Sequence, residues 1–344
     1  MNRKKIAVAM SGGVDSSLAA AFLLQKNFEV IGVTMLLFGE ENQNFIQDAK
    51  NVAEFLKINH YVADFRKDFE NDVEKYFVEN YLQGKTPNPC VQCNKKIKFG
   101  KLFDFVETIG ADFLATGHYA KIVFEDERFK LKKATDILKD QSYVLYNLTA
   151  EKLSKIILPL GDFSKNETRL LAEKYNLPVA KKKDSQEICF IPDNNYKKFL
   201  ELHAKNSDAL MLGEIVDNFG KVLGFHNGVA NYTIGQRKGL EIAAEYPLYV
   251  KKIDVAEKKI YVGKNEELFS EKLFAEKIHW IYEPKFPAKL QAKIRYGPKI
   301  FDCEVEQENN LISVKFFEKV RAVTSGQSVV FYDGDEVIGG GIIL

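Results

Sequence analysis

The sequence is poor in cysteine and has no long hydrophobic run. Its 344 residues include only four cysteines. Four thiols are too few to hold together a chain of this length, so a disulfide-rich scaffold is excluded and each cysteine becomes a candidate for chemistry. No apolar run reaches the length that spans a bilayer. The first apolar run leads into a glycine turn without a cleavage site, as a strand does and a signal peptide does not. We therefore expect a cytoplasmic protein with no membrane partner.

The chain also lacks an excess of either charge. Its 49 Lys and Arg residues against 48 Asp and Glu residues give a formal net charge of +1. Net charge therefore neither supports nor excludes a nucleic-acid partner, and only local patches bear on that question. The length exceeds that of a usual single domain, so we expect two or three domains.

A glycine-rich stretch near the N-terminus lies between a predicted strand and a predicted helix. Residues 5–8 are apolar as in a buried strand, and residues 18–25 are rich in Ala and Leu. Between them, residues 9–17 read AMSGGVDSS. Glycines let a ligand approach the backbone, and a helix N-terminus offers unpaired N–H groups to an anion. The stretch therefore predicts a phosphate or pyrophosphate site, with Asp15 available to hold Mg²⁺.

The glycine stretch is not a Walker A loop, because no lysine follows its glycines. SGGVDS instead resembles the PP-loop of the ATP pyrophosphatase superfamily, whose members split ATP between the α- and β-phosphates. The resemblance implies ATP as a substrate together with Mg²⁺. A capped glycine turn that binds no ligand is the alternative interpretation.

Strands and helices alternate along the first 204 residues. Expected strands are 28–37, 59–65 and 111–116, and expected helices are 40–57, 68–82, 97–109, 150–155, 165–175 and 195–203. This alternation predicts an α/β fold with a doubly wound, Rossmann-like parallel sheet. Ligands of such sheets bind at the carboxyl ends of the strands. The glycine stretch, Met35 and the turn at Gly117 would then share one edge.

After residue 205 the helical periods disappear. Short segments rich in β-branched and aromatic residues replace them, at 214–217, 249–253, 259–262, 289–296, 311–317 and 328–332. This pattern predicts two small, mostly β domains, of which the last is a β-barrel. The predicted domains are residues 1–204, 205–268 and 269–344, and the second boundary rests on the polar stretch 264–272.

Three of the cysteines lie in segments without clear helical period. Cys90 and Cys93 form a C-x-x-C within residues 84–98, where two prolines and an Asn predict a loop. Lysines follow Cys93 closely, and positive charge favours the thiolate. Cys189 lies far away in sequence, after the lysine run 181–183. Cys303 fits a strand pattern and is expected to be a small core residue.

The three thiols of Cys90, Cys93 and Cys189 leave several chemistries open. One is sulfur transfer, in which one cysteine carries a persulfide and a second thiolate attacks it, leaving a disulfide that a reductant must reset. Another is an iron–sulfur cluster with three thiolate ligands. A structural zinc site would require a fourth ligand. An adventitious C-x-x-C with no function is the remaining interpretation.

Seven motifs in order carry a resemblance to one family. They are SGGVDS, TPNPCVQCNKKIKFG, ATGHYAK, KDQSYVL, DSQEICFI, YTIGQRKGL and IRYGP. Together they resemble the tRNA-specific 2-thiouridylase family over nearly the whole chain. The resemblance implies an ATP-dependent sulfurtransferase that thiolates the wobble uridine of tRNAs for Lys, Glu and Gln. It would adenylate the 2-oxygen, release pyrophosphate and AMP, and take sulfur from a relay protein or directly from a cysteine desulfurase.

The resemblance also implies roles for individual residues. Cys93 would be the nucleophile, Cys189 the persulfide carrier, and Asp15 part of the catalytic loop. The ATP-binding residues would be Ala9, Met10, Ser11, Gly12, Gly13, Val14, Asp15, Ser16, Met35 and Gly117. The tRNA-contacting residues would be His118, Lys139, Asp140, Gln141, Arg295, Tyr296 and Gln327. The target-base region would comprise Lys95, Ile97, Lys98 and Phe99.

One position departs from the family pattern. Many members have Asp where this chain has Cys90, so a third thiol stands close to the expected pair. Cys90 could resolve a disulfide, ligate a cluster or have no role. We hypothesise that it is not the nucleophile.

Overall fold

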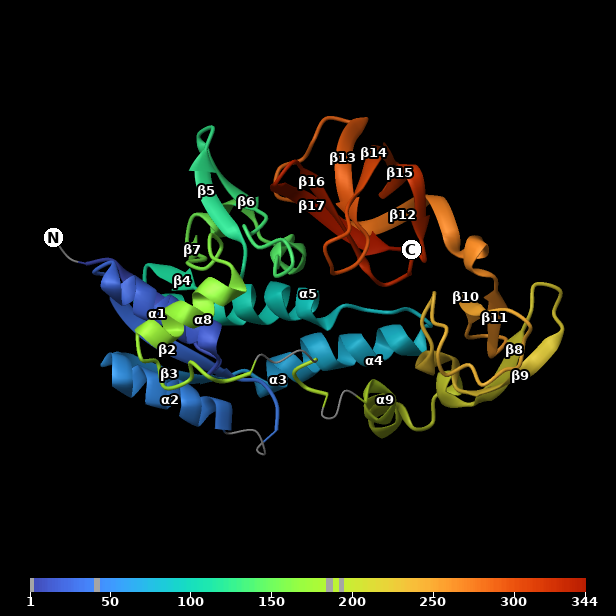
Figure 1. Ribbon diagram of the computed structural model, residues 1–344, viewed down its shortest axis with the longest axis horizontal. Coiled ribbons are helices and arrows are strands. Elements are labelled where there is room, and N and C mark those ends of the chain that lie inside the picture. Colours follow the sequence, from blue (N-terminus) through green and yellow to red (C-terminus); the bar gives the residue numbers. More distant parts are fainter. Residues whose placement is uncertain (1–2, 40–43, 184–187, 192–194) are drawn as a thin grey trace.

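A five-stranded parallel sheet forms the first part of the molecule (Figure 1). The computed structural model describes residues 3–39, 44–183, 188–191 and 195–344. The strand order is β3-β2-β1-β4-β7, and each neighbouring pair is parallel. These strands are β1 (Lys5–Ala9), β2 (Glu29–Leu36), β3 (Asn59–Asp64), β4 (Phe113–Ala115) and β7 (Ile156–Ile157). The middle of β1 is fully buried, as expected for a strand covered on both faces.

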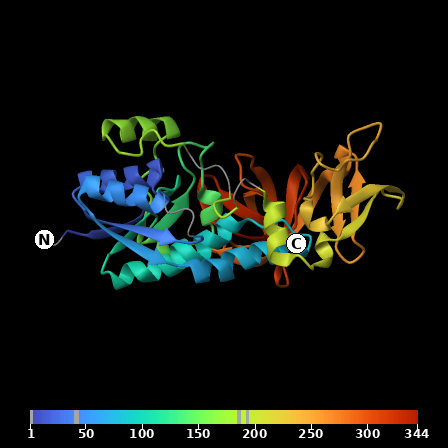
Figure 2. The ribbon, with the colours of Figure 1, turned by 90° about the horizontal axis from the view of Figure 1, so that it is seen from below.

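Helices cover both faces of this sheet. Figure 2 shows blue and green helices on one side of the blue strands and teal helices on the other. The helices of this part are α1 (Val14–Gln25), α2 (Asn44–Leu56), α3 (Arg66–Phe69), α4 (Lys75–Leu82), α6 (Leu102–Thr108), α7 (Ala150–Leu153) and α8 (Lys165–Lys174). Helix α9 (Tyr196–Ala204) follows and precedes the sheets of the second half of the chain. The predicted doubly wound parallel sheet is therefore confirmed. The first residues of the helix expected at 40–57 lie outside the described residues.

The segment that carries the C-x-x-C motif is helical, so the prediction of a loop over residues 84–98 is wrong beyond Asn88. Helix α5 (Pro89–Cys93) continues as a π-helical stretch (Asn94–Lys101) into α6. Pro89 is tolerated because the first residue of a helix needs no N–H donor. The Asn88 side chain caps the helix by accepting from the N–H groups of Cys90 and Val91 over 3.0 and 3.3 Å.

Two sheets follow in the second half of the chain. A four-stranded sheet has the order β10-β11-β8-β9 and comprises β8 (Leu212–Val216), β9 (Val222–Asn227), β10 (Tyr249–Asp254) and β11 (Lys259–Gly263). Six antiparallel strands then close through the β12–β17 pairing: β12 (Phe269–Trp280), β13 (Ala288–Lys293), β14 (Phe301–Glu308), β15 (Leu311–Arg321), β16 (Ser328–Asp333) and β17 (Glu336–Ile343). The predicted final β-barrel is confirmed, and the strand expected around Cys303 is β14, although the sequence patterns did not identify β9, β12 or β17.

A hairpin from the first part joins the barrel. Strands β5 (Lys121–Glu125) and β6 (Arg128–Lys132) extend the barrel sheet, because β6 pairs with β17. The Tyr282 hydroxyl of the barrel also donates to the Phe129 carbonyl over 2.9 Å. The sequence analysis did not predict this hairpin. The hairpin thus joins the part of the chain that forms the five-stranded parallel sheet to the barrel (Figure 1).

The barrel has a hydrophobic core of its own, built from inward-facing residues of its strands. Cys303 is fully buried there, as expected for a small core residue. No helix within the described ranges is both long and apolar enough to cross a membrane.

Candidate functional site

The glycine stretch, residues 9–17, forms a tight turn between β1 and α1, which we call the glycine loop. Gly13 is the N-cap of α1 and offers no side-chain cap, so the first N–H groups of the helix have no side-chain partner there. The backbone N–H of Ser11 donates to Ser16 Oγ over 3.1 Å, and Ser17 Oγ donates to the Gly13 carbonyl over 2.8 Å. These bonds hold the turn in shape around the uncapped helix end, which is the arrangement that binds anions.

Two glycines are required by close backbone contacts. Gly12 has φ +65°, and a Cβ there would lie 2.4 Å from the Phe45 carbonyl oxygen. A Cβ on Gly117 would lie 2.8 Å from the backbone of Asp15 and Ser16. Gly117 was expected to let ATP approach. In this structure its neighbour is instead the first turn of α1, so the turn after β4 packs directly on the glycine loop.

Two lysines that the sequence analysis did not assign to the nucleotide reach this loop. Lys165, the first residue of α8, is buried and donates to both carboxylate oxygens of Asp15 over 2.7 and 2.8 Å. Lys182 donates to the Gly12 carbonyl over 3.0 Å and pairs with Asp48 over 2.6 Å. The loop therefore receives its positive charge from segments more than a hundred residues away, in place of the lysine that a Walker A loop carries.

Asp15 does not fit the expected role as a free metal ligand. Both of its oxygens accept from Lys165, and one also accepts from the Tyr119 hydroxyl over 2.8 Å. A magnesium ion needs carboxylate oxygens that are not already paired in this way. Asp15 is therefore not available as a magnesium ligand in this structure.

The remaining ATP candidates lie where β1 and β2 end. Met10 and Val14 are buried, so their side chains belong to the core. Met35 is half-buried near the carboxyl end of β2, on the edge of the sheet where the glycine loop lies. Thr34 donates to the Met10 carbonyl over 2.8 Å and also contacts the His60 ring over 2.8 Å, which fixes the start of the loop.

Helix α5 (Pro89–Cys93) is the cysteine helix and carries two thiols. Cys93 is buried, whereas Cys90 is exposed as a residue although desolvation by the surrounding protein raises the pKa of its thiol. Burial raises the pKa of Cys93 to about 11, and the positive charge of Lys98 partly opposes this shift. Cys189 as a residue is exposed, but the surrounding protein reduces solvation of its thiol and raises its pKa to about 12. Negative charge on Cys93 and Cys90 adds to that shift, so the three thiols share one neighbourhood.

The turn after β4 connects the glycine loop to the cysteine helix. His118 is buried beside Gly117, its ring contacts Thr116 Oγ1 over 2.7 Å, and the Phe99 ring lies 6.0 Å away. Burial holds the pKa of His118 well below its ordinary value, and the charge of Lys98 lowers it further. Lys98 therefore lies near His118 as well as near the thiols.

The expected target-base region is largely core. Ile97 and Phe99 are fully buried, so they cannot meet a base in this structure, and Lys152 donates to the Phe99 carbonyl. Lys95 is exposed and Lys98 is half-buried. Only the two lysines could face a substrate, because the apolar side chains anchor the π-helical stretch to the core.

The expected tRNA-contacting residues divide into exposed and engaged positions. Arg295 and Tyr296 are exposed on the barrel, where Arg295 also donates to the carbonyls of Arg321 and Ala322, and Lys139 is half-buried. The others are engaged within the protein: Asp140 and His118 are buried, Gln141 Oε1 accepts from the Tyr119 N–H over 2.9 Å, and Gln327 Nε2 donates to the Thr86 carbonyl over 2.7 Å. The structure thus gives Asp140, His118 and Gln327 internal partners where the resemblance implied an RNA contact.

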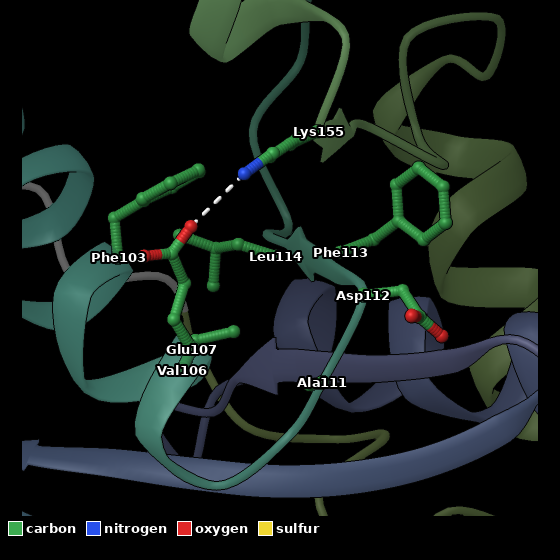
Figure 3. A pocket seen from close by; sticks show the side chains of 8 residues that line it. All are labelled: Phe103, Val106, Glu107, Ala111, Asp112, Phe113, Leu114 and Lys155. Carbon is green, nitrogen blue, oxygen red and sulfur yellow. Dashed lines mark hydrogen bonds and ion pairs between the residues drawn. The ribbon is translucent and has the colours of Figure 1, made fainter.

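A cavity in the first part of the molecule lies away from these residues. Figure 3 shows it between the end of α6 and the start of β4, where Lys155 pairs with Glu107 over 3.0 Å. It has a volume of about 260 Å³. Phe113 marks the amino end of β4, whereas the glycine loop follows the carboxyl end of β1. None of the expected site residues lines it.

No metal centre is formed by the residues that the structure describes. Among them, no group of three or more His, Cys, Asp or Glu side chains is arranged to hold an ion. Cys90, Cys93 and Cys189 are all described and do not form such a group.

Three protein-family models together match nearly the whole chain. Residues 4–193 match the tRNA methyl transferase HUP domain, residues 197–264 the tRNA methyl transferase PRC-barrel domain, and residues 270–343 the aminomethyltransferase beta-barrel domain.

Relatives of the same length are closely similar. The chain is 48% identical over 358 residues to the tRNA-specific 2-thiouridylase MnmA of Caldicellulosiruptor saccharolyticus, covering 99% of this chain and 98% of the relative. It is 44% identical over 357 residues to that of Clostridium perfringens, covering 100% and 99%. Among solved structures, the U34-tRNA thiolase NcsA from Methanococcus maripaludis gives a TM-score of 0.38 at 22% identity, covering 60% of this chain and 67% of that one. A similarity this low supports no conclusion about function.

Proposed function

This chain belongs to the tRNA-specific 2-thiouridylase family, and from that premise we propose that it catalyses ATP-dependent 2-thiolation of uridine in tRNA. We further propose that the substrate is the wobble uridine of tRNAs for Lys, Glu and Gln. One observation carries the proposal. The Gly117–His118 turn packs on the glycine loop at Gly117, and the ring of its His118 lies 6.0 Å from Phe99, in the π-helical stretch that continues the cysteine helix.

The glycine loop is suited to the first step. The 2-oxygen of uridine attacks the α-phosphorus of ATP, and pyrophosphate leaves. Ser11, Ser16 and the uncapped N-terminus of α1 offer donors to phosphate oxygens. Lys165 neutralises Asp15 and Lys182 neutralises Asp48, so the carboxylates beside the loop do not repel the charge that develops on the leaving group. Adenylation turns a poor leaving group into AMP.

The cysteines are suited to the second step. Cys189 would carry a persulfide, and the thiolate of Cys93 would attack its inner sulfur. That attack forms the Cys93–Cys189 disulfide and releases sulfide, which adds to the 2-carbon of the adenylated uridine as AMP leaves. A dithiol reductant then restores both thiols. The positive charge of Lys98 favours the thiolate of Cys93, although burial outweighs it before substrate binds.

The partners of this reaction are a tRNA and a sulfur donor. We propose that the donor is a relay protein or a cysteine desulfurase, acting on Cys189 because this residue is exposed. The exposed Arg295 and Tyr296 would contact the tRNA from the barrel. The base must leave its stack to reach the edge of the sheet.

A single assay tests the proposal. The protein is incubated with ATP, Mg²⁺, a persulfide source and unmodified tRNA for lysine, and the digested nucleosides are identified by mass while AMP and pyrophosphate are followed. Thiolated wobble uridine together with AMP release, lost in Cys189→Ser, is the expected result. Release of ADP, or release of AMP without any dependence on tRNA, would contradict it.

A further inference from the structure

A buried ion pair joins the first part of the chain to the barrel. Lys293 Nζ, at the end of β13, donates to Asp140 Oδ2 over 2.8 Å, and the two side chains are only 3% and 1% exposed. Asp140 Oδ1 also accepts from the N–H groups of Ala134 and Ser142, and Oδ2 accepts from Ser142 Oγ over 2.9 Å. Because a buried charge is tolerated only when it is fully paired, these bonds favour one placement of the barrel.

A second contact repeats the same spacing three residues further on in both segments. Tyr296 follows Lys293 by three residues, and Tyr143 follows Asp140 by three. Their rings pack edge to face with centroids 6.1 Å apart. Tyr143 is fully buried, and its hydroxyl donates to the Ser328 carbonyl over 2.8 Å. The exposed Tyr296 therefore packs against the ring of a buried, hydrogen-bonded tyrosine.

The loop that follows Lys293 borders the cysteine helix. The short helix Ser142–Leu145, which holds Tyr143, packs against α5, and the Tyr296 ring packs on Tyr143. Partial burial raises the pKa of Tyr296, and the negative charges of Asp140 and Cys90 raise it further. Arg295 donates to the carbonyls of Arg321 and Ala322. The segment around Asp140 is anchored in turn to the glycine loop, because Gln141 exchanges hydrogen bonds with the backbone of Tyr119, whose hydroxyl donates to Asp15.

We propose that Asp140 and Lys293 are positioning residues, which hold the exposed loop Arg295–Tyr296 beside the cysteine helix and so set where tRNA docks relative to the thiols. The proposal rests on the function proposed above. It moves Asp140 from direct RNA contact to placement of the barrel, since its carboxylate is sealed inside the protein. Neither member of the pair touches the substrate.

The test compares variants of the pair by steady-state kinetics. Asp140→Asn and Lys293→Met are each expected to raise the KM for tRNA at least about tenfold, the effect of about 1.4 kcal/mol. The KM for ATP should stay near that of the wild type, because the glycine loop keeps its lysines. Lys293→Arg retains the charge and should restore the KM for tRNA.

A matched control lies in the contact between the β5–β6 hairpin and the barrel. Arg128→Ala breaks an ion pair with Glu336 that is partly exposed, with a nitrogen–oxygen distance of 2.9 Å. Its KM for tRNA should remain that of the wild type. An equal rise in Arg128→Ala, or no rise in folded variants of the pair, would overturn the proposal.

A double variant and a tRNA-binding measurement separate a folding defect, and a failure of the proposed function, from a failure of this proposal. If a single variant fails to fold, the double variant Asp140→Asn/Lys293→Met decides, because it leaves no unpaired buried charge. If the wild-type protein does not thiolate tRNA, the proposed function fails by itself. The dissociation constants for unmodified tRNA, measured by fluorescence anisotropy on the same variants, then still show whether the pair sets RNA docking.

Discussion

The glycine loop leads into the first turn of α1, and the cysteine helix is α5. The charges around these two helix starts differ. The first turn of α1 has no side-chain cap, and Lys165 and Lys182 stand beside it. The first turn of α5 is capped by Asn88, and the buried thiol of Cys93 has a pKa raised to about 11. The start of α1 is arranged for an anion before substrate arrives. The cysteine helix keeps the thiol of Cys93, the proposed nucleophile, neutral.

The difference suits the order of the reaction. Pyrophosphate must be stabilised at once when the uridine is adenylated, so preformed donors are effective there. A thiolate held permanently next to a persulfide would react before the base is activated. Keeping Cys93 protonated until tRNA changes its surroundings would prevent that loss of sulfur. We therefore expect that substitutions in the glycine loop and in the cysteine helix affect different steps of the proposed reaction.

Removing the nucleophile is expected to have the largest effect. Cys93→Ser should lower thiolation at least about a thousandfold, because the hydroxyl cannot replace the thiolate. The KM for ATP should not change, since Cys93 lies outside the glycine loop. The matched control is Cys90→Ser on the same helix, which should keep most of the activity. Equal loss in Cys90→Ser would show that the roles of the two thiols are misassigned.

Removing a cation from the glycine loop is expected to have the next largest effect. Lys165→Met should lower the rate of tRNA-dependent pyrophosphate release about a hundredfold, because Asp15 and the phosphates would then repel each other. Lys174→Met, at the exposed end of the same helix, is the control and should be active. Pyrophosphate release is measured in single turnover. Unchanged release in Lys165→Met would mean that the loop is not prepared for anions.

The pH dependence tests the neutral thiol directly. Below a pKa of about 11, the thiolate fraction of Cys93 grows about tenfold with each pH unit, so thiolation limited by this attack should rise from pH 7 to pH 10. His118 stays neutral over this range because its pKa is depressed. Lys98→Met removes the charge that lowers the pKa of Cys93, so it should reduce the rate at every pH below that pKa, by about threefold to tenfold.

Single-turnover rates across this pH range check the prediction, with Lys96→Met as the exposed control on the same stretch. A profile that is flat from pH 7 to pH 10 would show that tRNA binding has already ionised the thiol. The contrast between the two ends would then hold only for the free protein.

The glycine loop was more predictable than the cysteine helix because its signal is contiguous. Six neighbouring residues between a strand and a helix define the loop. Lys165 and Lys182 reach it only through folding, so no local pattern marks them. Pro89 misled the sequence analysis because proline disrupts a helix interior but suits its first position.

Burial and long-range pairing explain the other differences. The resemblance assigned Ile97, Phe99 and Asp140 to the substrate, but alignment of motifs carries no information on which side chains face inward. The β5–β6 hairpin joins β17 across some two hundred residues of sequence, a pairing that depends on how the barrel docks. The alternation of β1, β2, β3 and β4 with helices, in contrast, follows from local apolar patterns and was predicted.

The smallest expected effect separates the two helix caps. Asn88→Ala removes the acceptor for two N–H groups of α5, and Ser164→Ala removes the capping box that starts α8 at Lys165. Each should lower the free energy of unfolding by about 1 kcal/mol, measured by urea denaturation. Asn88→Ala should slow sulfur transfer and leave the KM for ATP unchanged, whereas Ser164→Ala should raise the KM for ATP. If both variants changed the same kinetic parameter, the glycine loop and the cysteine helix would act as one unit. The contrast between an anion site formed before substrate binds and a thiol kept neutral would then be wrong.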